Sequence, residues 1–93
     1  MRAVLDGVVI AESDETVVVE GNHYFPIGSL NQELIRQAER TTVCGWKGTA
    51  NYYDVVTPDA TASNGAWYYP EPKDAAAQIK DHVAFGRPIV VES

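Results

Sequence analysis

Residues 41–55 read Thr41-Thr42-Val43-Cys44-Gly45-Trp46-Lys47-Gly48-Thr49-Ala50-Asn51-Tyr52-Tyr53-Asp54-Val55. This stretch contains the only cysteine of the chain, one of its two tryptophans and a lysine next to a glycine. β-Branched and aromatic residues on both sides of the Gly-Trp-Lys-Gly segment favour two strands joined by a turn. We expect this turn and the strand that follows it to line a small concave site.

The N-terminal part predicts a β-hairpin followed by a third strand. Asp6-Gly7 lies between the apolar runs 3–5 and 8–11, and an Asp-Gly pair tolerates the positive φ angles of a two-residue hairpin turn. Residues 16–20 include three consecutive valines, which favour a strand. The chain is therefore expected to open as a three-stranded meander, with a short extended piece at residues 23–26.

Two short helices are expected among the strands. Residues 30–38 place four apolar side chains on one helical face, and Ser29 with Gln32 fits a capping box at its start. Residues 71–80 carry Pro72 in the first turn of a second helix. Residues 57–64 are polar and predict an exposed loop, and further strands are expected over residues 49–56, 65–70, 83–85 and 89–92.

These elements predict one mainly β, antiparallel domain over residues 1–93, with two short helices. An α+β sheet with both helices on one side is the alternative, and a parallel fold is disfavoured because the helices are too few and too short. Side chains alternate between the two faces of a strand. Tyr52 should therefore face away from Tyr53, and Trp67 and Tyr69 away from Tyr68.

Composition excludes several classes of function. The net charge of −6 and the scattered basic residues argue against a nucleic-acid partner. One cysteine cannot form an internal disulfide, no Cys/His spacing fits a metal site, and no cofactor is expected. No apolar stretch is long enough to span a membrane, and charge interrupts the N-terminus too early for a signal peptide. The expected location is the cytoplasm.

Four motifs together resemble the DUF427 family, whose function is unassigned: Tyr24-Phe25-Pro26, residues 44–53, residues 66–72 and Val83-Ala84-Phe85. The resemblance implies a compact tent-like or barrel-like β fold, similar in outline to Mss4-like domains but without their zinc. The family is also labelled nucleotidyltransferase-like, although Gly45-Trp46-Lys47-Gly48 is no phosphate-binding loop. Tandem copies in some relatives suggest that a single domain could form a homodimer.

Cys44 is a candidate catalytic nucleophile. Lys47 lies three residues further on, and a nearby cation favours the thiolate. The alternative is that Cys44 is a small buried apolar side chain at a strand end. A catalytic cysteine is usually paired with a histidine, and only His23 and His82 are available.

The candidate ligand-binding residues are Glu20, Tyr24, Lys47, Tyr52, Trp67 and Tyr69. Lys47 would meet an anionic group, the aromatic residues would form the walls, and Glu20 would be a second polar anchor that needs a partner of its own. The alternative for the aromatic residues is an ordinary core, and Lys47 and Glu20 would then be solvated. The leading hypothesis is a domain that binds a small anionic molecule; the alternatives are an enzyme that uses Cys44 or nucleotidyl transfer, and a structural homodimer.

Overall fold

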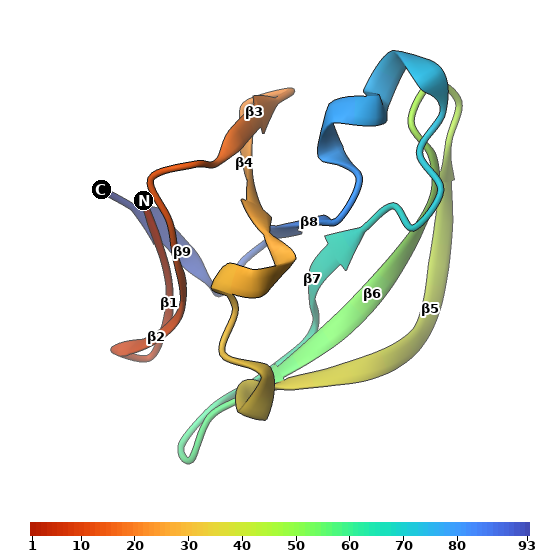
Figure 1. Ribbon diagram of the computed structural model, residues 1–93. Helices are drawn as coiled ribbons and strands as arrows, with labels where there is room; N and C mark the ends of the chain where they lie inside the picture. The colour runs from red at the N-terminus through yellow and green to blue at the C-terminus, as the bar shows by residue number, and fades with distance from the viewer.

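The computed structural model describes residues 1–93 and contains two antiparallel β-sheets with three short 3-10 helices (Figure 1). The predicted mainly β class is confirmed. The strands are β1 (Arg2–Leu5), β2 (Val8–Glu12), β3 (Val17–Val19), β4 (Asn22–Pro26), β5 (Ile35–Cys44), β6 (Gly48–Val56), β7 (Thr61–Tyr68), β8 (His82–Phe85) and β9 (Val90–Glu92). The 3-10 helices are η1 (Ile27–Ser29), η2 (Gln32–Leu34) and η3 (Asp74–Ile79). None of them has the length and apolar character needed to cross a membrane.

The smaller sheet has the strand order β2-β1-β9. The predicted hairpin turn is present, with φ of 50° at Asp6 and 78° at Gly7. β9 pairs with β1, so the two ends of the chain lie side by side (Figure 1). The prediction that residues 16–20 complete a meander with these strands is wrong. β3 pairs instead with β4, because Glu20 and Gly21 both adopt positive φ and turn the chain directly back on itself.

The larger sheet has six strands in the order β3-β4-β8-β7-β6-β5. It does not close into a barrel, because β3 and β5 remain edge strands. Each edge strand belongs to a hairpin: β3 turns into β4, and β5 turns into β6. The long β5–β6 hairpin curves along one side of the molecule (Figure 1). The fold thereby holds the tips of two hairpins, one from each end of the sheet, near η3.

The helix predicted over residues 30–38 is wrong. Its second half forms the start of β5, which pairs with β6 from Ile35 opposite Val55 to Cys44 opposite Gly48. The predicted capping box is also absent, since the Ser29 hydroxyl donates to the Pro26 carbonyl and Asn31 caps η2 instead. Four apolar residues at helical spacing could not outweigh the hydrogen bonds offered by a neighbouring strand, so tertiary context overrode the local pattern.

The second helix and the polar loop are both shorter than predicted. The helix at residues 71–80 is the 3-10 helix η3, with an internal kink at Ala76. β7 begins at Thr61, so only four residues separate β6 from β7. Two hydrogen bonds close this connection. The backbone N–H and the hydroxyl of Thr57 both donate to the Ala60 carbonyl.

Two hydrophobic clusters pack against the larger sheet. The larger cluster includes Phe25, Val55 and Phe85 and extends to residues of the smaller sheet such as Leu5 and Ile10. The smaller cluster contains seven buried residues: Val19, Tyr24, Ala50, Tyr69, Ala76, Ile79 and Ala84. Tyr52 and Trp67 pack against the smaller cluster, while Tyr53 and Tyr68 pack against the larger one. The predicted alternation along β6 and β7 is confirmed.

Replacing Gly65 in β7 tests how closely the strand packs against the core. A Cβ at this position would lie 2.7 Å from the Ala62 Cβ and 3.1 Å from the Ile89 Cδ1. We expect Gly65→Ala to lower the free energy of unfolding by about 1–3 kcal/mol, as overpacking does. Gly28→Ala is the matched control, because no atom lies within 4 Å of its added Cβ. Equal urea midpoints for the two variants would contradict this packing.

Candidate functional site

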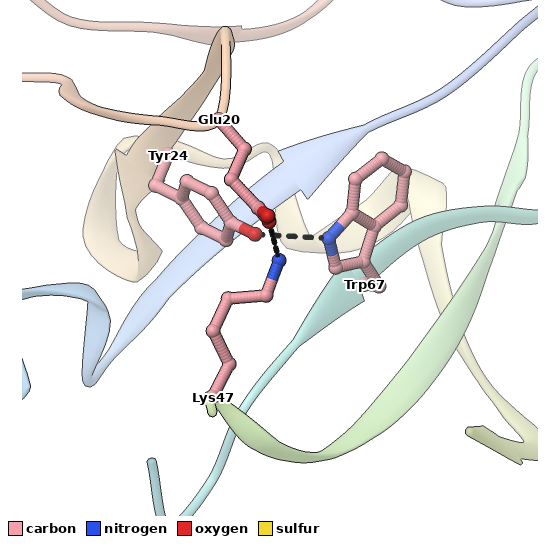
Figure 2. Close-up of polar contacts among 4 residues, drawn as sticks. All are labelled: Glu20, Tyr24, Lys47 and Trp67. Carbon is pink, nitrogen blue, oxygen red and sulfur yellow. Dashed lines mark hydrogen bonds and ion pairs between the residues drawn. The ribbon is translucent and has the colours of Figure 1, made fainter. Parts of the chain in front are cut away.

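An ion pair joins the tips of the two hairpins (Figure 2). Glu20 lies in the β3–β4 turn, and Lys47 lies in the three-residue turn between β5 and β6. The Lys47 ammonium donates to the Glu20 carboxylate, so Glu20 has the partner that an inward-pointing carboxylate needs. The two side chains differ in exposure: 8% of the Lys47 side chain is accessible to solvent, against 50% of the Glu20 side chain. The ammonium is therefore nearly buried, while its partner remains in contact with water.

Aromatic side chains surround the Lys47 ammonium. Nζ lies 5.5 Å from the ring centroid of Trp46 and 5.5 Å from that of Tyr69, within the range of a cation–π contact. Tyr24 is fully buried, and its hydroxyl accepts a hydrogen bond of 3.2 Å from Trp67 Nε1. Tyr24 and Trp67 stand on either side of the ion pair (Figure 2). The ammonium is thus enclosed by ring faces and one carboxylate.

The charges of the pair stabilise each other. The hydrogen bond from Lys47 lowers the pKa of the Glu20 carboxyl, so its charged form is favoured. Burial disfavours the Lys47 ammonium, but the hydrogen bond to Glu20 and the negative charge of the Glu20 carboxylate act in the opposite direction, and the pKa of Lys47 is raised. Burial also raises the pKa of the Tyr69 phenol. At neutral pH the pair therefore consists of one ammonium and one carboxylate, beside the neutral phenol of Tyr69.

Tyr52 forms the outer part of the aromatic wall. Its ring lies 6.4 Å from that of Trp67, and its hydroxyl is 3.0 Å from the Thr42 hydroxyl. The Arg40 guanidinium lies over the Tyr52 ring, 5.3 Å from the ring centroid. Tyr52 therefore reaches the Lys47 cluster through Trp67 and makes no polar contact with the ammonium.

Cys44 lies at the end of β5, where its half-buried thiol faces the turn that carries Lys47. The backbone N–H groups of Trp46 and then Lys47 lower the pKa of the thiol, and the Lys47 charge contributes in the same direction. Neither histidine supports Cys44 as a base: His23 Nδ1 pairs with the Thr16 hydroxyl, and His82 Nδ1 donates to the Lys80 carbonyl. The pKa of the Cys44 thiol is therefore lowered by backbone donors and by Lys47, and no histidine contributes.

Lys73 holds the Lys47 turn in place, a role that the sequence did not reveal. Its ammonium donates to the Gly45 carbonyl at 2.7 Å, and its backbone N–H donates to the Lys47 carbonyl at 2.9 Å. Gly48 adopts a φ of 114°, and a Cβ there would lie 3.3 Å from the Glu71 carbonyl oxygen. No local motif in the sequence signals a contact between Lys73 and a turn 28 residues away.

A comparison with family models gives one match, described as "Domain of unknown function (DUF427)", over residues 1–92. The chain belongs to the DUF427 family. The resemblance drawn from the four sequence motifs is confirmed, and it extends over almost the whole chain. No curated protein matches the sequence.

Three hollows border the Lys47 cluster of this DUF427 domain, and none of them contains Lys47, Glu20 or Cys44. A hollow of about 390 Å³ lies beside Trp67, Gly21 and Arg87. A second of about 480 Å³ lies over Gly48 and Thr49, and a third of about 200 Å³ touches Tyr69. The single pocket expected over residues 44–52 is thus replaced by a packed cluster with hollows at its edges.

The side chains of this domain form no set of ligands for a metal ion. No group of three or more His, Cys, Asp or Glu side chains lies close enough together to hold an ion. Nucleotidyl transfer by the usual route requires metal-binding carboxylates, so the residues present do not fit that label.

Removing either member of the ion pair should have unequal effects on stability. Glu20→Gln leaves a buried ammonium without a counter-ion, whereas Lys47→Met leaves a carboxylate that water already reaches. We expect Glu20→Gln to lower the melting temperature more than Lys47→Met does, and the double variant to recover most of that loss.

The difference between Glu20→Gln and the wild type should disappear in acid. It is fully present above the ordinary carboxyl pKa of 4.5 and is lost as the pH falls through the lowered pKa of Glu20 in the folded protein. Melting curves between pH 3 and 8 measure this. A larger loss for Lys47→Met at neutral pH would contradict the assignment of the buried charge to Lys47.

Proposed function

We propose that this DUF427 domain binds a small anionic molecule through the Lys47 ammonium. The observation that carries the proposal is the asymmetry of the ion pair, with a nearly buried cation and a half-exposed anion. A methionine of similar length would fill the same space without the cost of removing an ammonium from water. Core packing alone therefore does not account for a lysine at position 47.

Glu20 is placed so that a ligand anion can replace it. Its side chain projects from a two-residue turn, and half of its surface remains in water, so withdrawal of the carboxylate requires no change in the core. Its backbone has a φ of 54°, a conformation that favours glycine, asparagine or aspartate over glutamate. A glutamate in this position supports a role for its carboxylate, which occupies the anion site when no ligand is bound.

The surrounding residues suit a planar or hydroxyl-bearing anion. Tyr24 and Tyr69 place their phenols around the ammonium, and Trp67 separates it from the hollow of about 390 Å³. Arg87 also lines that hollow and makes no ion pair within the protein, so its guanidinium can attract an anion toward the site. Tyr52 would contact only a ligand that extends past Trp67.

Ligand binding is tested with phosphate, acetate and a nucleoside monophosphate by calorimetry and thermal shift. We expect at least one of them to stabilise the wild type by mass action. Glu20→Gln should bind that anion about tenfold more tightly, because the competing carboxylate no longer occupies the site. Lys47→Met should abolish binding.

One control variant separates this site from general charge effects. Lys80→Met removes an exposed lysine that makes no ion pair and should leave anion binding unchanged. A Glu20→Gln variant that binds no more tightly than the wild type, together with a Lys47→Met variant that still binds, would refute the proposal.

A specific observation also favours the second candidate, an enzyme that uses Cys44 as a nucleophile. Backbone donors and a cation next to a half-buried thiol are the conditions under which cysteine becomes reactive near neutral pH. The anion site would then hold the substrate beside the thiol.

Thiol labelling tests the state of Cys44. We expect the rate of reaction with iodoacetamide to reach half its maximum at a lower pH in the folded protein than for free N-acetylcysteine. Lys47→Met should move the midpoint back upward by a small amount, because the backbone donors contribute more than the lysine charge. A midpoint at or above that of N-acetylcysteine would exclude an activated thiol.

A further inference from the structure

The hollow of about 200 Å³ differs in chemistry from the Lys47 site. Its walls are three tyrosines, Tyr53, Tyr68 and Tyr69, together with Pro70, Asp81 and His82. It lies where the end of β7 meets the turn before β8. No lysine or arginine lines it, in contrast to the hollow beside Arg87.

The three tyrosines are held rigidly. The rings of Tyr53 and Tyr68 stack with their centroids 4.6 Å apart and an interplanar angle of 18°. The Tyr68 hydroxyl donates to Gln37 Oε1 at 2.9 Å, and Tyr69 is 5% exposed. Burial, with the neighbouring Tyr68, raises the pKa of Tyr53 to about 12, so that its phenol stays neutral. The three tyrosines therefore contribute aromatic surface to the hollow, and the face of an aromatic ring carries partial negative charge.

Asp81 supplies the only carboxylate among the residues that line the hollow. It is exposed, and it belongs to neither of the two ion pairs of the protein, Arg2–Glu92 and Lys47–Glu20. Its φ of 61° is a conformation that aspartate tolerates, so the turn places this residue at the rim. His82 donates its Nδ1–H to the Lys80 carbonyl, which leaves Nε2 without a partner in the protein.

We propose that this hollow binds a trimethylammonium group, with Tyr53, Tyr68 and Tyr69 as the aromatic wall and Asp81 as the counter-ion. Ring faces attract cations, and a methylated cation loses little hydration when it enters such a site. A primary ammonium needs three hydrogen-bond acceptors and loses strong hydration on entry, whereas the apolar part of the wall, which includes Ile27 and Pro70, suits methyl groups. An anion is disfavoured by Asp81 and by the net charge of −6.

The volume of this hollow is sufficient for a trimethylammonium group and little more. A quaternary ammonium on a short chain fills a hollow of this size, while the rest of a longer ligand would extend into water past Asp81 and Pro70, both of which are exposed. The same chemistry occurs in a free molecule such as choline and in a trimethylated lysine of a peptide.

Titrations followed by NMR of the tyrosine ring protons test the proposal with choline and with 3,3-dimethylbutanol, its neutral isostere. We expect choline to bind saturably and at least about fivefold more tightly than the isostere. This difference in affinity would come from the cation–π contact, which the neutral isostere cannot make. Ethanolamine should bind more weakly than choline. Acetylated trimethyllysine amide distinguishes the source: tighter binding than choline assigns the site to a peptide, and weaker binding assigns it to a free molecule.

Matched variants locate the binding. Tyr53→Phe keeps the ring and should keep most of the choline affinity, whereas Tyr53→Leu should lower it about fivefold or more. Asp81→Asn removes the charge without disturbing the left-handed backbone and should also weaken choline while leaving the isostere unchanged. No choline binding at 50 mM, equal affinity for the two probes, or unchanged affinity in Asp81→Asn would overturn the proposal. Glu12→Gln removes an exposed charge on the smaller sheet that makes no ion pair and should have no effect on choline affinity. Choline and the anions are titrated separately, so failure here is distinguishable from failure of the anion site.

Discussion

The burial of the Lys47 ammonium against the Glu20 carboxylate is the constraint on which the rest of this structure depends. The six-stranded sheet is open, and its edge strands β3 and β5 have no partner on their outer sides. Each edge strand continues into a hairpin turn, and the ion pair joins the two turns. The smaller hydrophobic cluster lies beneath this contact, with Tyr24 contributed from one end of the sheet and Ala50 from the other.

An ion pair is a costly means of joining two turns. An apolar pair of similar volume would usually be at least as stable, because neither side chain would have to leave water. The cost is increased by a glutamate in a left-handed backbone conformation. Two unfavourable choices in direct contact indicate that this position is shaped by a requirement other than stability. A cation that is protected from water but reachable by displacing one carboxylate meets the requirement for binding an anion.

Sequence reasoning succeeded where local chemistry determines structure. Asp6-Gly7 has few alternatives to a tight turn, and alternation along β6 and β7 correctly separated Tyr52 and Trp67 from Tyr53 and Tyr68. The need of an inward-pointing Glu20 for a partner was also stated, whereas local chemistry did not determine that the partner is Lys47. These inferences use only the preferences of single residues and the periodicity of a strand.

Sequence reasoning failed where distant segments decide the outcome. The apolar spacing of residues 30–38 is compatible with a helix, but β6 offered a complete row of hydrogen-bond partners and the segment became a strand. The valines of β3 indicated a strand without indicating its sheet, since the choice depends on the turn at Glu20 and Gly21. The contacts of Lys73 and the hollow around Tyr53 likewise join residues that are far apart in sequence.

The alternation of β7 also separates the proposed anion site from the proposed cation site. Trp67 faces the cluster that contains the ammonium, while Tyr68 faces the hollow rimmed by Asp81. Tyr69 borders both, with its ring 5.5 Å from Lys47 Nζ and its side chain also lining the hollow. Because Tyr69 is almost fully buried, it forms a fixed wall between the two. A single aromatic ring therefore lies near a lysine and also lines the hollow that contains an aspartate.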